Sequence, residues 1–400
     1  MKKHFLLFFT CISVLFCKSQ EYVFVFQDIY PKDIQVGAER TQSYLSLLQG
    51  QQIALCANHT SMVGNTHLLD TLLSRGIAVA KVFTPEHGFR GESKAGEKVN
   101  NSIDEKTKMP IVSLYGNNKK PTAEQLAGID IIIFDIQDVG ARFYTYISTL
   151  HYIMEAAAEN GVKVLVLDRP NPNGFWVDGA ILDTAFRSFV GMHPVPIAHG
   201  MTVGEYAKMI NGEGWLANGI RCELAVVPVL GYAHLFRYQL PVNPSPNLSS
   251  MEAVYLYPTL CLFEGTPMSI GRGTDKPFRV LGYPNFPDGN ITFTPQNNAA
   301  ATNPPCMGKL CKGFDLDDMA NIILKNNNFI NINLIIEAYK SFPQKNKFFT
   351  PFFDKLAGTS TLREQIIAGK SAEEIRKSWQ NGLNAFKQIR KKYLLYPDFE

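Results

Sequence analysis

The side chains best equipped for chemistry lie close together in the segment 83–97, Phe-Thr-Pro-Glu-His-Gly-Phe-Arg-Gly-Glu followed by Ser-Lys-Ala-Gly-Glu. Its ionisable candidates are Glu86, His87, Arg90 and Glu97. An apolar run over 77–83 stops at the Pro-Glu-His-Gly turn, as a buried parallel strand would. Because the carboxyl ends of parallel strands open onto the crevice where α/β sheets bind ligands, we interpret this segment as part of a functional site. The alternative is a solvated turn, although a connector does not need so many ionisable groups.

Three further predicted strands, over 53–57, 129–134 and 162–167, also end in polar side chains. Those that follow them are Asn58, Asp138, Arg142, Tyr144, Asp168, Arg169, Asn171 and Asn173. Each has a structural alternative: Asp138 as a helix N-cap, Asp168 and Arg169 as an internal ion pair, and Pro-Asn-Pro-Asn-Gly as a turn. Four such clusters at strand carboxyl ends are harder to explain as structure alone, and they favour one shared site at that edge of the sheet.

The elements that must position these residues follow a strand–helix rhythm in the first half of the chain. Apolar runs at 53–57, 77–83, 111–115, 129–134, 162–167 and 222–229 are predicted strands, and 67–74, 146–160 and 202–211 are predicted helices. The pattern Thr122-Ala-Glu-Gln125 marks another helix start. Gly161 is predicted to end the helix over 146–160. Strand–helix–strand units at this spacing predict parallel strands with right-handed crossovers. The fold class is therefore α/β, with a Rossmann-like open parallel sheet.

After about residue 235 the rhythm breaks. Residues 241–246 are Pro-rich, 255–279 are punctuated by Gly and Pro, and 288–312 are rich in Asn, Pro and Ala. Helices return at 316–325, 334–341 and 372–393. We predict a Rossmann-like domain over 20–235 and a smaller α+β domain over 236–400 that closes a cleft against it.

The first 19 residues predict export. Met1-Lys-Lys-His is basic, 5–16 form an apolar core too short to span a bilayer, and Lys18-Ser-Gln-Glu21 is polar. We expect cleavage near Ser19 and a periplasmic or secreted protein, with no stable membrane insertion. A lipid anchor on Cys17 is the alternative, which the bulky Phe16 before it disfavours.

Composition excludes several classes of protein. The formal net charge is +3, and loss of Lys2, Lys3 and Lys18 with the leader would bring it to zero, so nothing favours nucleic-acid binding. Five of the seven cysteines remain after the leader: Cys56, Cys222, Cys261, Cys306 and Cys311. None has zinc-site spacing, although Cys306 and Cys311 could pair in an oxidising compartment. We expect neither a metal nor a cofactor.

The remaining motifs point away from nucleotides and toward sugars. No phosphate-binding loop or Gly-x-Ser-x-Gly elbow occurs, and Gly271-Arg-Gly273 lacks the third glycine and the context of a dinucleotide fingerprint. Carboxylates, amides, arginines and aromatic rings remain. Carboxylates can act at an anomeric carbon, amides and arginines can bind hydroxyls, and aromatic rings can stack on a sugar.

The chain resembles the bacterial exo-β-N-acetylmuramidases (NamZ-like, glycoside hydrolase family 171) from about residue 35 to its C-terminus. The blocks that carry the resemblance are 85–91, 134–146, 167–174, 191–201, 244–247, 261–266 and 271–274. Residues 285–312 are individual to this chain, which bears on fine specificity more than on reaction type. The resemblance implies a Rossmann-like domain, a smaller second domain and a cleft between them. It also implies removal of N-acetylmuramic acid (MurNAc) from the non-reducing end of fragments such as MurNAc-β-1,4-GlcNAc.

Within this hypothesis, Glu86 is the first candidate for the catalytic carboxylate, and Glu264 and Glu97 are candidates for its partner. The 2-acetamido group of the substrate is an alternative nucleophile. The lactyl carboxylate of MurNAc suits an arginine fork, for which Arg90, Arg142, Arg169 and Arg272 are candidates. Asn247 and His199 complete the predicted substrate-binding set, although His199 could serve only to organise its loop.

Two other functions compete with a glycosidase acting in cell-wall turnover. A non-catalytic periplasmic protein that binds sugars or muropeptides would use a similar two-domain cleft. A nucleotide-dependent enzyme is disfavoured by the missing phosphate loop. For the glycosidase and for the sugar-binding protein, the expected partner is a small carbohydrate.

Overall fold

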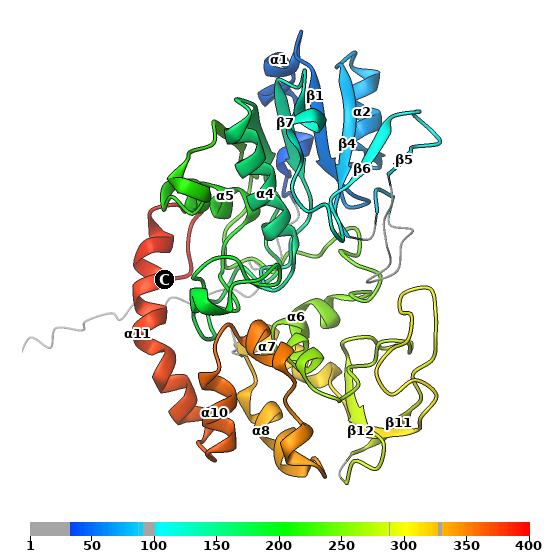
Figure 1. The fold of residues 1–400 in the computed structure, drawn as a ribbon, viewed down its shortest axis with the longest axis vertical. Coiled ribbons are helices and arrows are strands. Elements are labelled where there is room, and N and C mark those ends of the chain that lie inside the picture. The colour runs from blue at the N-terminus through cyan, green and yellow to red at the C-terminus, as the bar shows by residue number, and fades with distance from the viewer. Residues whose placement is uncertain (1–32, 87, 91–100, 288, 327–329) are drawn as a thin grey trace, which may run out of the picture.

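A seven-stranded sheet, in the order β5-β6-β4-β1-β7-β8-β9, dominates the first half of the protein (Figure 1). The structure is a computed structural model that describes residues 33–86, 88–90, 101–287, 289–326 and 330–400. The strands are β1 (Ile53–Ala57), β4 (Val79–Thr84), β5 (Ser102–Ile103), β6 (Pro110–Ser113), β7 (Ile131–Asp135), β8 (Lys163–Leu167) and β9 (Leu224–Val227). All pairings are parallel except that of the edge strand β5 with β6.

The parallel strands follow one another in the Rossmann order. Counted along the chain, the six parallel strands lie in the spatial order third, second, first, fourth, fifth, sixth, which reverses direction between β1 and β7. The two strands at that switch point pair in register, from Ile53 beside Ile131 to Ala57 beside Asp135. Both are buried along their whole length, which explains why they read as continuous apolar runs. The predicted α/β class is confirmed.

Helices accompany the sheet, and all of those named next except α1 were predicted from the sequence. They are α1 (Leu45–Leu48), α2 (Leu68–Ser74), α3 (Ala123–Leu126), α4 (Tyr146–Glu159) and α5 (Val203–Gly212). Thr122 and Gln125 form the predicted capping box of α3. Gly161 follows α4 with a φ of 68°, the left-handed conformation that glycine adopts readily after a helix.

The second half mixes helices with a small antiparallel sheet, as predicted. It contains α6 (Met251–Leu260), α7 (Asp317–Asn326), α8 (Ile332–Ser341), α9 (Pro351–Ala357), α10 (Thr361–Ile367) and α11 (Ala372–Lys391), with β10 (Val280–Tyr283), β11 (Ile291–Phe293) and β12 (Cys311–Asp315). A two-stranded hairpin of β2 (Met62–Val63) and β3 (Thr66–His67) was not expected. Nor was α6, which lies partly in a stretch expected to be irregular. Residues 253–260 of that helix are all buried, so it shows no helical periodicity of polar and apolar side chains.

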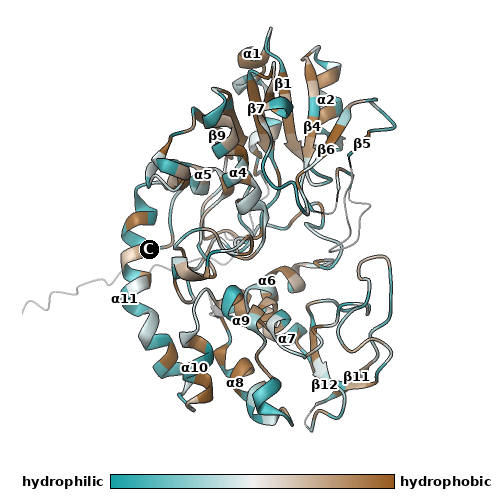
Figure 2. Cartoon of the chain, in the orientation of Figure 1, coloured by the Kyte–Doolittle hydropathy of each residue, from teal (hydrophilic) through white to brown (hydrophobic). Residues whose placement is uncertain are grey.

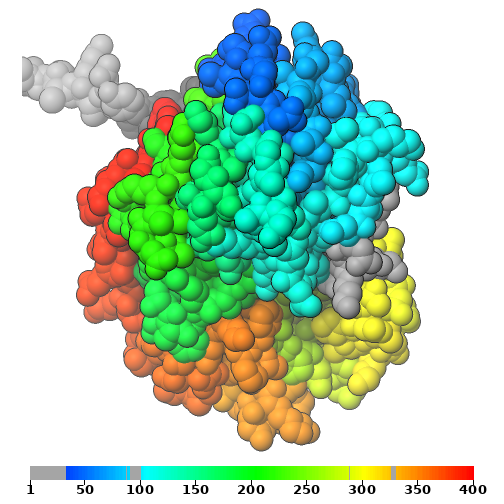
Figure 3. All heavy atoms as spheres, turned by 45° about the horizontal axis from the view of Figure 1, so that its top comes forward, coloured from blue at the N-terminus to red at the C-terminus, as the bar shows by residue number. Residues whose placement is uncertain are grey.

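One apolar core joins the two halves. Its largest cluster contains Ile132 from β7 and Leu150 from α4 together with Phe353 and Leu383 from α9 and α11. Helix α11 runs back along the molecule toward α5 (Figure 1), and hydrophobic and hydrophilic residues alternate along it (Figure 2). Its buried side chains include Ile375, Trp379 and Leu383. The C-terminal segments lie directly against residues of the first half (Figure 3). The domain boundary near residue 235 stays a prediction, and the core contains side chains from both sides of it.

Two predictions about the leader and membrane association remain expectations. Residues 1–19 lie outside the described part of the chain. Among the helices that are described, none is both long and apolar enough to cross a bilayer.

Candidate active site

A cavity of about 140 Å³ brings together carboxylates from both halves of the chain. Glu86 contributes from the loop after β4, and Glu264 and Arg272 contribute from the turns after α6. Most of the other wall is aromatic or apolar: Phe143, Tyr144, Thr145, Tyr146, Val190, Ser245, Leu248, Tyr257, Cys261, Phe278, Phe352 and Leu356. A pair of carboxylates inside an aromatic wall is the combination that the sequence predicted for a sugar site.

Glu86 lies just beyond the carboxyl end of β4. The buried Pro85 precedes it, which fixes the chain direction as the strand ends. The hydroxyl of Tyr115, two residues beyond the end of β6, donates a hydrogen bond of 3.0 Å to Glu86 Oε1. Burial, and then the Glu86 carboxylate, raise the pKa of Tyr115, so the phenol keeps its proton and remains the donor. Adjacent parallel strands therefore orient the first candidate carboxylate from two sides.

Glu264 is held by an arginine. It lies in the 3-10 turn Cys261–Gly265, and Arg272 donates to its Oε1 from Nη2 at 2.6 Å and from Nε at 3.2 Å. The guanidinium also lies 5.0 Å from the centre of the Phe278 ring. Burial acts to lower the pKa of Arg272, but the Glu264 carboxylate outweighs this and raises the pKa above its usual value. Both side chains keep about a quarter of their surface exposed, at 22% for Arg272 and 26% for Glu264, so a substrate can reach the pair.

Two unpaired polar groups lie close together beside the cavity. Tyr146 Oη and Asn58 Nδ2 are buried near each other and make no hydrogen bond of good geometry. The Tyr146 ring packs edge-on against Tyr144, whose own hydroxyl donates to the carbonyl of Pro244 at 2.7 Å. Buried polar atoms without well-formed hydrogen bonds are uncommon in folded proteins, and of these two residues Tyr146 lines the cavity. Tyr144 and Glu86 are thus predicted residues that line the cavity, and Asn58 lies next to Tyr146 behind them.

Three of the four candidate arginines are occupied elsewhere. Arg90 forks onto Asp104 at 2.7 and 2.8 Å, and Arg169 forks onto Asp135 while also donating to the carbonyl of Met62. Arg169 does form an internal ion pair, but with Asp135 and not with its neighbour Asp168.

Arg142 is fully buried and donates to three backbone carbonyls, those of Ala180, Val195 and Leu356. That burial lowers the pKa of Arg142 to about 9. Arg272 is therefore the one of the four that lines the cavity.

The predicted aspartates are buried and do not line the cavity. Asp168 accepts hydrogen bonds from the Thr202 hydroxyl and the Gly204 amide, both at 2.7 Å, and from Tyr396 near the C-terminus. Burial raises the pKa of Asp168 to about 6. Asp138 accepts from the Gly140 amide at 2.6 Å, its Oδ1 has no partner, and burial raises its pKa to about 7.

The predicted asparagines also organise the backbone. Asn171 donates to the Met201 carbonyl at 2.9 Å, and Asn173 donates to the carbonyls of Val139 and Val254 at 2.9 and 3.0 Å. Asn247 donates to the carbonyl of Ala300 at 2.8 Å. The sequence placed Asn171 and Asn173 after the carboxyl end of a predicted strand, and Asn247 entered only through the resemblance, but in neither case could it show which way the amide points.

His199 is buried close to Asp138. Its Nδ1 accepts from the Met201 amide at 3.2 Å, and burial, then Arg390 and Arg142, lower its pKa to about 3. The ring is therefore neutral. The predicted His87 and Glu97 lie outside the described residues.

Sequence reasoning missed Tyr115, Tyr257, Phe278 and Phe352. Tyr115 could have been found in the same way as Glu86 and Asn58, because it lies at the end of a predicted strand, the apolar run 111–115. The other three come from the second half, where no strand end marked their place.

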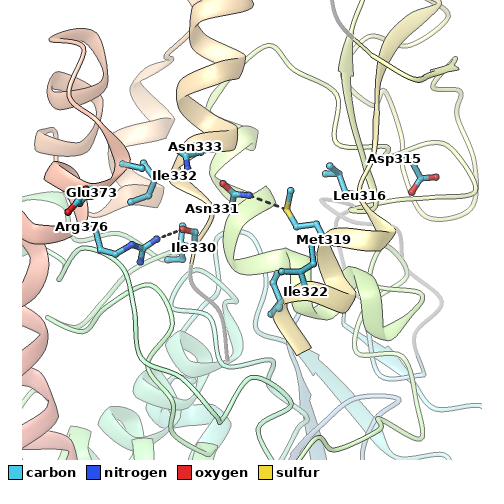
Figure 4. Close-up of a pocket in the computed structure, with 12 residues that line it drawn as sticks. Asp315, Leu316, Met319, Ile322, Ile330, Asn331, Ile332, Asn333, Glu373 and Arg376 are labelled. Atoms are coloured by element: carbon cyan, nitrogen blue, oxygen red, sulfur yellow. Dashed lines mark hydrogen bonds between the residues drawn. The ribbon is translucent and has the colours of Figure 1, made fainter. Parts of the chain in front are cut away.

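A larger cavity, of about 630 Å³, lies between α7, α8 and the start of α11 (Figure 4). Its walls are mainly apolar, with Leu316, Met319, Ile322 and Ile332 prominent. Arg376 there donates to the Ile330 carbonyl at 2.8 Å and pairs with Asp178, so its charge is already compensated. Size alone would favour this cavity, but the carboxylate pair of the smaller one favours catalysis.

Comparison with known proteins decides the family. The model for the N-terminal part of the exo-β-N-acetylmuramidase NamZ matches residues 53–252, and the model for the C-terminal part matches 255–396. The chain belongs to the NamZ family. A peptidoglycan β-N-acetylmuramidase NamZ from Bacillus subtilis (strain 168) is 40% identical over 91% of both chains.

Two solved structures support the NamZ fold. Both are DUF1343 family proteins from Bacteroides fragilis NCTC 9343, and each matches over its whole length and over 92% of this chain. One is 47% identical with a TM-score of 0.84, and the other is 28% identical with a TM-score of 0.79. The Rossmann-like sheet and the mixed second half are therefore shared by this NamZ family member and solved relatives.

Proposed function

We propose that this protein is an exo-acting glycosidase that removes terminal β-1,4-linked MurNAc from the non-reducing end of peptidoglycan fragments such as MurNAc-GlcNAc. The single observation that carries the proposal is the cavity that holds Glu86 and Glu264 together inside an aromatic wall. Membership of the NamZ family supports the same activity. The reaction belongs to cell-wall recycling.

The chemistry divides between the two carboxylates. Breaking a glycosidic bond needs a proton for the leaving oxygen and negative charge near the anomeric carbon, where an oxocarbenium-like transition state develops. Glu86, oriented by Tyr115, is assigned the proton transfer. Glu264 faces the cavity as the negative half of its ion pair with Arg272, so it is assigned the stabilisation of positive charge on the sugar. The 2-acetamido group of the substrate is the alternative nucleophile in this scheme.

Arg272 is assigned a second role in recognising MurNAc. The lactyl group of MurNAc carries a carboxylate that GlcNAc lacks, and a guanidinium binds carboxylates with two parallel donors. Arg272 lines the cavity, whereas Arg90, Arg142 and Arg169 are engaged with Asp104, backbone carbonyls and Asp135. One arginine thus lies beside both the catalytic carboxylate and the space for the substrate.

The test is hydrolysis of MurNAc-β-1,4-GlcNAc by the purified mature protein, followed by mass spectrometry of the products. Release of free MurNAc and GlcNAc is expected. A longer fragment with GlcNAc at its non-reducing end should resist the enzyme, because the terminal residue must be MurNAc. Tight binding of the disaccharide without turnover would replace the glycosidase with a sugar-binding protein.

The proposed location is the periplasm or the exterior, reached through the predicted leader at residues 1–19. Peptidoglycan fragments are found there, and the NamZ family membership of the chain is consistent with such a substrate. Fractionation of cells that express the full chain would test this, with the mature protein expected outside the cytoplasm.

A further inference from the structure

A second cavity, of about 260 Å³, adjoins the candidate active site. The two cavities share Glu264, Arg272 and Phe352 in their walls. The rest of the second wall consists of Met268 and Ile270 on one side and residues 301–305 on the other. A ligand that extends past the Glu264–Arg272 pair would therefore enter a second, ready-made space.

The outer wall of this cavity is a loop that is fixed before any ligand arrives. The amide of Asn303 donates to Asn297 Oδ1 at 2.7 Å, and the amides of Ala300 and Ala301 both donate to Asn298 Oδ1 at 2.9 Å. Asn247 holds the same loop from the other side through the Ala300 carbonyl. A preformed wall lowers the entropy lost on binding, so the loop is suited to recognition.

Gly273 allows this loop to approach Arg272. It adopts a φ of +79°, and a Cβ there would lie 2.3 Å from the Gln296 carbonyl oxygen and 2.6 Å from Pro304 Cγ. The Gln296 amide in turn donates to the Gly273 carbonyl at 2.9 Å. Because no side chain separates the two segments, the wall of the second cavity continues directly from Arg272.

The surfaces inside the second cavity suit a sugar ring. Met268 and Ile270 are almost completely buried and give an apolar floor, while Phe352 is 37% exposed. Thr302 and Asn303 are exposed and supply polar side chains at the rim. A pyranose has one face of C–H groups, which packs on an aromatic ring, and an edge of hydroxyls, which needs polar partners.

We propose that this second cavity is the leaving-group subsite, which holds the sugar on the reducing side of the scissile bond, with Phe352 as its stacking platform. The inference rests on the proposed function, which places the terminal MurNAc beside Glu86 and Glu264. The bond to be broken then lies next to Glu264 and Arg272, and the following sugar lies beyond them. The loop 296–305, in the part of the chain that is individual to this protein, becomes a determinant of specificity for the released sugar.

The experiment compares two substrates that differ only beyond the scissile bond: MurNAc-β-1,4-GlcNAc and methyl β-MurNAc. Phe352→Ala should lower the ratio of kcat/KM for the disaccharide to kcat/KM for the methyl glycoside by about tenfold, the scale of a lost aromatic stacking contact. Phe352→Tyr should keep the ratio. Ile367→Ala removes an exposed apolar side chain from the neighbouring helix α10, away from both cavities. This variant should leave kcat/KM unchanged for both substrates.

Direct binding gives an independent readout. Methyl β-GlcNAc should bind the unmodified protein and Ile367→Ala equally, and Phe352→Ala should weaken that binding by a similar factor, measured by ligand-observed NMR. Circular dichroism would establish that each variant is folded.

The proposal fails if Phe352→Ala lowers kcat/KM on both substrates equally, because the ring would then serve the MurNAc or its lactyl group, which both substrates contain. It also fails if methyl β-GlcNAc binds Phe352→Ala as well as the unmodified protein. Absence of hydrolysis of either substrate by the unmodified protein would instead refute the proposed activity. The binding of methyl β-GlcNAc would still show in that case whether Phe352 and the second cavity hold a sugar.

Discussion

Glu86 and Glu264 face one cavity although they come from opposite halves of the chain. Glu86 follows a strand of the parallel sheet, and Glu264 lies in a 3-10 turn that continues directly from α6. Each has a separate orienting partner, Tyr115 for Glu86 and Arg272 for Glu264. The site therefore depends on how the two halves pack, and catalysis needs both.

The first prediction concerns these two carboxylates. Glu86→Gln keeps the size and most of the hydrogen bonding of the side chain but removes the charge and the transferable proton. Turnover of MurNAc-GlcNAc should fall by at least about a hundredfold, the usual scale for a lost acid–base group. Glu264→Gln should cause a comparable loss. Steady-state release of MurNAc, measured by chromatography, is the readout.

Glu223→Gln is the matched control, since Glu223 forms a surface ion pair with Lys163 and is 68% exposed. It should retain normal turnover. Near-normal activity in Glu86→Gln would remove Glu86 from the proposed mechanism and direct attention to Glu97.

The second prediction concerns selectivity for MurNAc. If Arg272 binds the lactyl carboxylate, kcat/KM for 4-nitrophenyl β-MurNAc should exceed that for 4-nitrophenyl β-GlcNAc by about ten- to a hundredfold, as charged hydrogen bonds of this kind contribute roughly 1.5–3 kcal/mol. Arg272→Ala should collapse this ratio. Both absolute rates should also fall, because Glu264 loses its partner.

Arg279→Ala provides the comparison. Arg279 forks onto Asp317 at 2.6 Å from both donors, so the variant breaks an equivalent ion pair in the same half of the chain. It lines neither cavity and should leave the MurNAc/GlcNAc ratio intact. Equal kcat/KM on the two glycosides in the unmodified protein would contradict the muramidase proposal and indicate a general hexosaminidase.

The sequence predicted the sheet far better than the orientation of side chains at its edge. β1 is apolar over its whole length, β7 up to its last residue Asp135 and β8 after its first residue Lys163, so all three could be located within two residues. Strand ends then placed Asn58, Glu86 and Asp168 at the same edge. Whether a side chain faces the cavity or the interior depends on backbone partners far along the chain, such as Leu356 for Arg142, which periodicity does not reveal.

In the second half of the chain, local sequence patterns predicted the structure poorly. Its helix α6 has no polar face, and the strands β10 and β11 have only four and three residues, so neither gives a clear local pattern. Glu264 and Arg272 were identified from motif resemblance, and Phe352 was not identified at all. These residues are brought together by tertiary packing against Phe278 and α9, which no local signal encodes.

The third prediction concerns Cys306 and Cys311. Both are free thiols, and a hydrogen bond from Cys311 lowers the pKa of Cys306. Exposure to oxidised glutathione should join them: the Cys306 thiolate attacks the glutathione disulfide, and Cys311 then displaces the bound glutathione as a thiol. Intact-mass analysis should show the loss of two hydrogens without added glutathione.

Cys306→Ser should abolish this product, and a stable mixed disulfide with glutathione in the unmodified protein would contradict the expected pairing. Cys222→Ser is the control, because Cys222 is buried beside β9 and burial raises its pKa, which disfavours reaction.

The last prediction concerns the effect of pH on stability through Asp138. Its folded pKa of about 7 lies above the ordinary value of 3.8 because the carboxyl is buried, so the folded state holds the proton more tightly than the unfolded state. The contribution of this group to stability is therefore fully present below about pH 4 and is lost as pH rises toward 7. The loss is on the order of a few kcal/mol for a fully buried carboxyl.

Asp138→Asn removes the titration and retains an oxygen for the Gly140 amide. The neighbouring groups are the neutral His199 and the phenols of Tyr144, Tyr146 and Tyr206, whose raised pKa values keep them protonated in this range. The variant should therefore lose less stability than the unmodified protein between pH 5 and pH 8. Urea denaturation at both pH values measures this, with the exposed Asp275→Asn as the control. An identical pH dependence in Asp138→Asn and the unmodified protein would show that the unpaired Oδ1 is not a source of instability at neutral pH.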